Sequence, residues 1–340
     1  MFLNSGITAA YVGSTSVSKL YLGSTLVWPL SIDYKTKYLT MKFLSSGYVC
    51  LKKYNSTSPS LTVYYSKNGG EWISVLSDDA TQINVVDGDE IRWKGTNSAY
   101  STGSDNYCSF SGTSTFNLYG NILSLKYGDN FNVQNDTLDS YAFNKLFSTS
   151  RVADAYNLPL DFGTINERSL RQLFSLCQDL ITAPKLLSVQ TANILGAAAM
   201  FFKSYNLKNG MNISATTLNG KQNFQEIYSN CTALTNPGII QVGNLTADSF
   251  SQAFIQCTSL ETAPDLLADT LSNGSYYRLF YGCSKLNYVK CMATNHSATN
   301  CTYQWLSGVK NGGTFVKKRG VSWNSGNSAI PSSWTVIEED

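Results

Sequence analysis

The stretch Phe254–Leu267, FIQCTSLETAPDLL, decides the fold, because nearly the same pattern stands at Phe174–Leu187, FSLCQDLITAPKLL. Both stretches follow the spacing Phe-x-x-Cys-x-x-Leu-x-x-Ala-Pro-x-Leu. Weaker copies lie around them, and in every copy a Cys or Ser occupies one column, at residues 150, 177, 204, 231, 257 and 283. The intervals of 27, 27, 27, 26 and 26 residues predict a solenoid of six repeats.

Each repeat predicts a short apolar strand, such as Leu180–Leu186, followed by an irregular or helical return, such as Thr191–Phe202. One repeat cannot bury its apolar face alone, so the repeats must stack, and the Phe column would form an aromatic ladder. Ala-Pro is lost in repeats one, three and four. There we expect less regular strands, at Ala-Tyr (155–156), Gly-Met (210–211) and Pro-Gly (237–238).

The Cys column is expected to hold buried structural thiols. Ser replaces Cys at residues 150 and 204, so the column does not need a disulfide or a metal. A buried thiol behaves as a small apolar group, which suits a tight inward turn. The eight Cys residues also lack the CxxC and Cys/His spacings of zinc sites.

The open ends of a solenoid expose apolar faces and need caps. At the C-terminal end we expect the segment 305–340 to form the cap. The apolar residues predicted to cover the last repeat are Phe315, Val316, Trp323, Ile330, Trp334, Val336 and Ile337. The acidic residues Glu338, Glu339 and Asp340 would keep the outer surface hydrated.

Residues 31–130 predict a different domain, a small antiparallel β-sandwich. Alternating apolar and polar residues predict strands at 38–43, 61–65, 82–86 and 90–93. Turn residues separate the strands, at 67–70 and 87–89. Asp87, Asp89 and Glu90 raise the alternative of a calcium site, but the loop lacks the full ligand pattern, so we favour a hairpin turn.

The first thirty residues contain a ten-residue repeat, YVGSTSVSKL at 11–20 and YLGSTLVWPL at 21–30. Each Gly-Ser-Thr predicts a tight turn, and the segment predicts a three-stranded β-meander. So small a sheet is marginal alone. We therefore expect residues 1–30 to be an anchor that self-associates or docks on a carrier, with Tyr11, Tyr21 and Trp28 as the assembly contact. Packing on the chain's own sandwich is the less favoured alternative.

Charge and hydropathy exclude two classes of partner. The net charge is +2 and the densest basic run is Lys317–Arg319, which is too short a footprint for nucleic acid. The longest apolar stretch, Ile194–Phe202, is far below the ~20 residues of a membrane span. The opening MFLNSGITAA has neither a basic region nor a long apolar region, so we expect no secretory signal.

The residues needed for catalysis do not gather in the sequence. The single histidine, His296, lies in a polar stretch and is expected to be an exposed loop residue. No P-loop or GxGxxG motif appears, and no triad is credible around one histidine. The carboxylate pairs Asp78–Asp79 and Asp161 with Glu167 leave glycoside hydrolysis as the enzymatic alternative. We expect that the chain is not an enzyme and that it has no catalytic, cofactor-binding or metal-binding site.

Several motifs resemble one family. The copies FIQCTSLETAPDLL and LFYGCSKLNYVKC resemble BspA-like leucine-rich repeats of gut Bacteroidales and their phages. The ending GTFVKKRGVSWNSGNSAIPSSWTVIEE looks like the usual terminus of those proteins, and IRWKGT…FNLYGNILSLKYGDNF resembles the β-domain that commonly precedes the repeats. The opening YVGSTSVSKLYLGSTLVWP is similar to the start of many phage structural proteins, crAss-like phages included.

The resemblance implies a mainly β chain with an α/β leucine-rich-repeat solenoid at 131–304, between the sandwich and the cap. It also implies a virion protein, a head fibre or decoration protein made in the bacterial cytoplasm and carried on the virion surface. Such a protein would dock on the capsid or on another virion protein through residues 1–30. A homotrimer is expected, and host-surface or mucin glycans are candidate ligands of the repeats. The alternatives are a receptor-binding tail fibre and a bacterial surface adhesin without its export signal.

Overall fold

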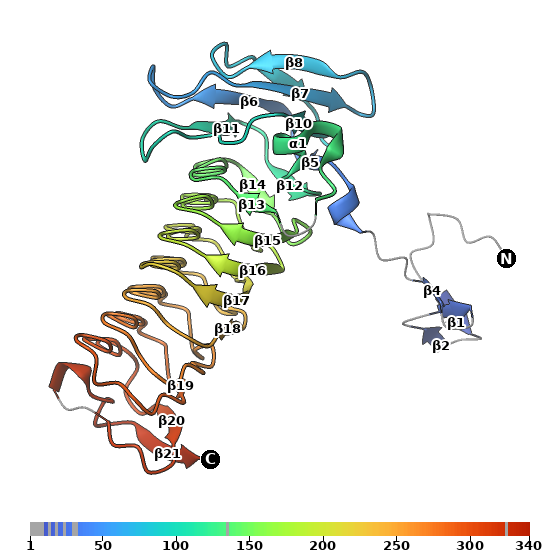
Figure 1. Cartoon of the computed structure of the whole chain (residues 1–340). Coiled ribbons are helices and arrows are strands. Elements are labelled where there is room, and N and C mark those ends of the chain that lie inside the picture. The colour runs from blue at the N-terminus through green and yellow to red at the C-terminus, as the bar shows by residue number, and fades with distance from the viewer. Residues whose placement is uncertain are drawn as a thin grey trace. The chain divides into compact units, whose positions relative to one another are not determined.

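The computed structural model describes the backbone of residues 10–12, 15–17, 20–22 and 25–28, and all of residues 33–133, 136–323 and 326–340. The chain divides into two compact units, Met1–Tyr34 and Lys35–Asp340. Among the described residues, most of those in regular secondary structure belong to β-strands (Figure 1). The helical elements are one short α-helix, α1, and three 3-10 turns: α1 (Ser124–Tyr127), η1 (Tyr34–Thr36), η2 (Gly128–Asn130) and η3 (Gly326–Ser328).

In the first unit, two antiparallel strand pairs are described. Strand β1 (Ala10–Val12) pairs with β2 (Thr15–Val17), and β3 (Leu20–Leu22) pairs with β4 (Thr25–Trp28). Each pair is a separate two-stranded sheet, so the predicted three-stranded meander is wrong. Each pair falls almost entirely within one copy of the ten-residue repeat. Each copy has its own turn residues, so its two strands pair with each other.

The second unit begins with two sheets that face each other, and all their strand pairs are antiparallel except the parallel pair β12–β14. One has the order β14-β12-β5-β10-β7-β8 and the other the order β11-β6-β9. The ring centroids of Trp93 and Phe110, one from each sheet, lie 4.8 Å apart in the shared core. The strands are β5 (Leu39–Phe43), β6 (Gly47–Lys53), β7 (Thr62–Lys67), β8 (Ile73–Leu76), β9 (Ile83–Val85), β10 (Glu90–Gly95), β11 (Cys108–Gly112), β12 (Phe116–Tyr119) and β14 (Val152–Asp154). The four strands expected here from alternation are present as β5, β7, β9 and β10.

A β-solenoid of about seven turns follows (Figure 1). Its parallel sheet has the order β13-β15-β16-β17-β18, and aligned residues stand one coil apart, as in Phe162↔Val189 and Val189↔Ala215. The strands are β13 (Thr137–Leu138), β15 (Leu160–Ile165), β16 (Leu186–Ala192), β17 (Asn212–Leu218) and β18 (Ile240–Val242). The strand predicted at Leu180–Leu186 lies further along the chain, because β16 begins only at Leu186 and Thr182 before it forms isolated parallel bridges to Asp154 and Asn209. Pro184 between them has no backbone N–H with which to continue a ladder.

The returns between strands are runs of turns, not helices. Every fourth residue has a positive φ, and the residues fall into three columns that repeat from coil to coil. The columns are Tyr141, Arg168, Leu195, Gln222, Asp248, Gly274 and Asn300; Lys145, Gln172, Ala199, Glu226, Gln252, Arg278 and Gln304; and Thr149, Leu176, Lys203, Asn230, Gln256, Gly282 and Gly308. The α/β character expected of the repeats is thus missing, since left-handed residues every four positions interrupt a helix.

Hydrogen bonds between coils take the place of helical ones. The Phe147 N–H donates to the Leu173 carbonyl of the next coil at 3.0 Å, whereas the Leu146 N–H donates to Phe143 in its own turn at 3.2 Å. This alternation satisfies the backbone without a helix. Seven returns follow the scheme, one more than the six repeats expected from the Cys column.

The aromatic column forms the expected ladder in the core. Neighbouring ring centroids lie 5.3–5.7 Å apart from Phe147 to Phe280. Its members are Phe147, Phe174, Phe201, Tyr228, Phe254 and Phe280. All six rings are buried, so they contribute apolar burial in addition to the stacking itself.

The C-terminal end closes with a parallel sheet of β19 (Tyr288–Cys291), β20 (Thr314–Lys318) and β21 (Thr335–Glu339). Most of the expected cap residues do cover the core: Phe315, Val316 and Trp334 are buried, and Trp323 and Ile330 pack against the cluster. Val336 and Ile337 remain 44% and 47% exposed, contrary to the prediction. Strand β21 is the outermost strand and pairs only with β20, so nothing described covers these two side chains.

Candidate functional site

The predicted assembly contact lies in the first unit. Tyr11 is on β1, Tyr21 on β3 and Trp28 on β4. The side chains of all three lie outside the described residues. The assembly role of these residues therefore stays a prediction.

The carboxylates considered for glycoside hydrolysis have separate ionic partners. Asp161 pairs with Lys35 and Glu167 pairs with Arg168. Hydrogen bonds from Ser60 and Lys53 lower the pKa of Asp78. A glycosidase acid needs a raised pKa, so the direction at Asp78 is opposite to the one that this chemistry requires.

Asp89 organises the turn between β9 and β10, but the hairpin that was expected here is wrong, because these two strands lie in different sheets and do not pair. Its carboxylate accepts hydrogen bonds from the Asn68 amide at 2.7 Å and the Val86 N–H at 2.9 Å, and it pairs with Lys67 at 2.8 Å. These contacts, the Asn68 bond first, lower its pKa to about 2. Within the described ranges, no three His, Cys, Asp or Glu side chains gather in a way that could hold a metal ion.

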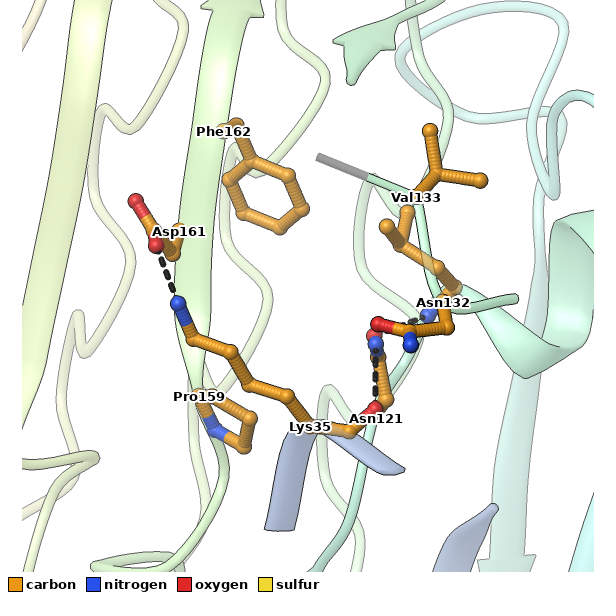
Figure 2. A pocket seen from close by; sticks show the side chains of 8 residues that line it. Lys35, Asn121, Asn132, Val133, Pro159, Asp161 and Phe162 are labelled. Atoms are coloured by element: carbon orange, nitrogen blue, oxygen red, sulfur yellow. Dashed lines mark hydrogen bonds and ion pairs between the residues drawn. The ribbon is translucent and has the colours of Figure 1, made fainter. Parts of the chain in front are cut away.

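A small hollow of about 30 Å³ lies at the start of the second unit (Figure 2). The Asn121 amide donates to the carbonyls of Lys35 at 3.0 Å and Phe131 at 3.3 Å, and its oxygen accepts the Leu123 N–H. The Lys35 side chain reaches past Pro159 to Asp161. The hollow has room for about one water molecule. Its side chains tie the segment after Asp33 to the first coils, and this is a structural role.

His296 is not the exposed loop residue that was expected. Its side chain is buried and stacks on Trp323, with centroids 4.4 Å apart, and Trp323 stacks on Trp305 at 5.1 Å. The ring atom Nε2 lies 3.1 Å from the Ser322 carbonyl. The indole that buries the histidine comes from the cap, and nothing in the polar stretch around His296 indicates this contact.

The cysteines are all buried free thiols. In the column, Cys177 Sγ donates to the Phe147 carbonyl at 2.9 Å, and Ser204 Oγ donates to the Phe174 carbonyl at 2.8 Å. Either group thus satisfies the carbonyl of the aromatic residue in the preceding coil, which explains why Ser can replace Cys in this column. Burial raises the pKa of Cys177 to about 12. A thiol with so high a pKa is a poor nucleophile and a poor metal ligand.

Two cations of the basic run near the C-terminus form ion pairs within the chain. Lys317 pairs with Glu338, and Arg319 pairs with Asp340. Lys290 pairs with Glu339 at 2.7 Å. The acidic tail therefore pairs with two of the three cations of this run and with Lys290. Among the described residues, no helix has the length and apolar character needed to cross a membrane.

The ladder of backbone hydrogen bonds along the parallel strands of the solenoid is interrupted between two coils. A backbone N–H continues the ladder in three earlier coils, and the donors are Ala155, Ala183 and Gly210. Pro237 takes this position in the next coil and has no N–H. No backbone hydrogen bond joins 237–243 to 262–268 in this described part, and a hollow of about 480 Å³ opens beside Ile239 and Leu267. Of the three irregular sites expected, only the one with proline breaks the ladder.

The sequence did not indicate a group of partly exposed side chains in the last two coils. These side chains lie on the surface formed by the runs of turns, which we call the turn face. We name the group the turn-face cluster: Tyr277, Arg278, Tyr281, Tyr303 and Gln304. The Arg278 guanidinium carbon lies 5.2 Å from the ring centroid of Tyr277 and 5.3 Å from that of Tyr281. Arg278 Nε donates to Gln304 Oε1 at 2.9 Å, and Tyr303 stacks on Tyr277 at 5.6 Å. The neighbouring Tyr276 is buried, so only the structure separates the two adjacent tyrosines.

Comparison of the chain with protein-family models, with curated proteins and with solved structures finds no match. The function therefore has to be argued from the arrangement of the chain's own residues.

Proposed function

We propose that this chain is a non-enzymatic structural protein of a phage particle, a head fibre or decoration protein on the virion surface. In this proposal the first unit docks on the capsid or another virion protein, and the second unit displays the solenoid. The observation that carries the proposal is the division of the chain into a small strand-paired unit and a much larger unit that contains the solenoid. The opening motif, similar to the start of phage structural proteins, supports the virion assignment.

The solenoid itself supports a role in display. Antiparallel sheets close its first coil and a parallel sheet covers its last, so the coils between them are protected at both ends. Carboxylates that a hydrolase would use are paired with Lys or Arg, and the thiols are buried. These features favour a stable binding scaffold over a catalyst.

We infer that the coils are BspA-like leucine-rich repeats. Support comes from the period of 26–27 residues and from buried column leucines such as Leu180 and Leu260. The returns made of turns depart from the α/β version of the repeat. Homotrimer formation through the first unit is part of the same proposal.

The test is particle attachment. A triple variant with Tyr11, Tyr21 and Trp28 replaced by Ala is expected to be absent from purified particles while its solenoid stays folded by circular dichroism. Incorporation at the wild-type level would refute the anchor. Gold labelling of wild-type particles then locates the protein: label at the tail would make it a tail fibre. A chain found only on bacterial surfaces would make it an adhesin.

A further inference from the structure

The chain contains its own example of an arginine that lies on a tyrosine ring and binds a carboxylate. On the turn face of the second coil, the Arg168 guanidinium carbon lies 5.7 Å from the Tyr141 ring centroid. Arg168 Nη1 donates to the Tyr141 hydroxyl at 2.9 Å and to the carboxylate of Glu167. The Glu167 carboxylate shows which chemical group this arrangement takes.

Arg278 stands in the neighbouring column of the turn face and also lies on tyrosine rings, which here come from its own coil. Two tyrosine rings flank its guanidinium, and the preceding residue is Tyr277 where Arg168 has Glu167. No carboxylate of the described residues forms an ion pair with Arg278. Gln304 engages Nε, which orients the plane of the guanidinium and leaves its two terminal nitrogens as a fork. Such a fork matches the two oxygens of a carboxylate.

The surroundings favour a sugar over a protein as the bearer of that carboxylate. The Tyr277 and Tyr281 rings and the Gln304 amide lie around Arg278, and Tyr303 stacks on Tyr277. Asn273 and Ser307 of the same two coils are exposed polar residues. In the described part of the chain, no large apolar side chain is exposed between Leu267 and Val336. The buried centre of a protein interface is usually apolar, and no exposed large apolar side chain supplies such a centre here.

We propose that the turn-face cluster binds the carboxylate of an acidic sugar, of the uronic or sialic acid class. Arg278 would hold the carboxylate in a bidentate contact, and the phenol and amide groups would meet the sugar hydroxyls. This inference rests on the proposed display function, and it names the ligand class and the residues.

The test measures binding of defined probes to the full chain by saturation-transfer NMR and calorimetry. The acidic probes are the methyl α-glycoside of N-acetylneuraminic acid and methyl β-glucuronide, which separate the two sugar sources. Methyl β-glucoside is the neutral probe, and an acetylated, amidated triglutamate is the peptide probe. We expect at least one acidic sugar to bind about tenfold or more tightly than the glucoside.

The decisive variant is Arg278→Gln. Glutamine fits the site, because Gln172, Gln252 and Gln304 occupy the same positive-φ column. Affinity for the acidic sugar is expected to fall about tenfold or more. The matched control Arg168→Gln removes an arginine already paired with Glu167 and should leave the affinity within about twofold.

Three outcomes overturn the inference. They are equal binding by Arg278→Gln and wild type, no binding of either acidic sugar, and tighter Arg278-dependent binding of triglutamate, which would make this a peptide site. Particle attachment is a separate measurement. A chain that attaches to particles but binds no acidic sugar would overturn this inference and leave the proposed function standing.

Discussion

Phe110 of strand β11 stacks on Phe147 of the first coil, with 5.4 Å between the ring centroids and 16° between the ring planes. The ladder of the solenoid therefore begins inside the antiparallel sheets. At the same junction, β12 pairs in parallel with β14. The two contacts close the first coil by continuing its core and its hydrogen bonding into the preceding sheets.

Truncating the Phe110 ring should destabilise the facing sheets and the solenoid together. We expect Phe110→Ala to lower the free energy of unfolding by roughly 3–5 kcal/mol, since the buried ring leaves a cavity in a shared core. Urea unfolding followed by fluorescence and by circular dichroism measures this change. Val336→Ala, at an exposed position, is the control and should have little effect. A loss below 1 kcal/mol at Phe110 would contradict the role of this contact.

The positive-φ columns predict that glycine stabilises selected turns. Leu176 has a φ of 60° and is 38% exposed, and its column contains Gly282 and Gly308. Leu176→Gly should raise the free energy of unfolding by up to about 1 kcal/mol, because the left-handed conformation is unstrained in glycine. Leu186→Gly, at similar exposure but on strand β16, should lower it. Equal effects of the two changes in thermal unfolding would refute the backbone argument.

The Cys column predicts that its positions prefer a side chain that can donate a hydrogen bond. Cys231 Sγ donates to the Phe201 carbonyl at 3.1 Å. Cys231→Ser keeps a donor, as at Ser204, and should change the stability by less than about 1 kcal/mol. Cys231→Ala leaves the carbonyl unsatisfied and should cost about 1–3 kcal/mol. The two variants are compared by chemical denaturation, and the opposite order would sink the donor account.

Asp89 predicts acid sensitivity of the turn between β9 and β10. Its folded pKa is about 2, below the usual 3.8, so its contribution is fully present above pH 3.8 and disappears as the pH falls through 2. This is the pH dependence expected of a carboxyl group whose pKa is lower in the folded state than in the unfolded state. Asp89→Asn should remove this part of the pH dependence between pH 4 and 2. Unfolding curves measured across that range decide, and parallel curves for both proteins would contradict the assignment.

The first unit predicts the assembly state. Light scattering on the full chain should give the mass of a trimer, and a chain that starts at Ser31 should give a monomer. The physical reason is that short two-stranded sheets need partners to be stable. A monomer in both cases would mean that the first unit docks only on its carrier.

The repeat could be predicted because it is a matter of spacing. The columns at Phe174 and Cys177 recur at fixed intervals, and stacking then follows from the need to bury one apolar face. The loss of regularity at Pro237 was also foreseeable, because proline lacks the donor. Ala155 and Gly210 keep that donor, so the ladder continues there.

The rest depends on conformation and on distant contacts. Residues as different as Tyr141, Lys145 and Thr149 share a positive φ, and residue type alone does not indicate it. His296 is buried by Trp323 from the cap, and Arg278 is positioned by Gln304 from the next coil. Such neighbours become visible only once the register between coils is known.

The change in coil length from 27 to 26 residues after Cys231 shows that the stack tolerates coils of unequal length. Each coil bonds only to the one before it and the one after it, and the closing structures are confined to the two ends. Duplication or deletion of one whole coil would therefore change the reach of the protein by about 4.8 Å without rebuilding either end. Gain or loss of whole coils would therefore change the length of the solenoid in equal steps.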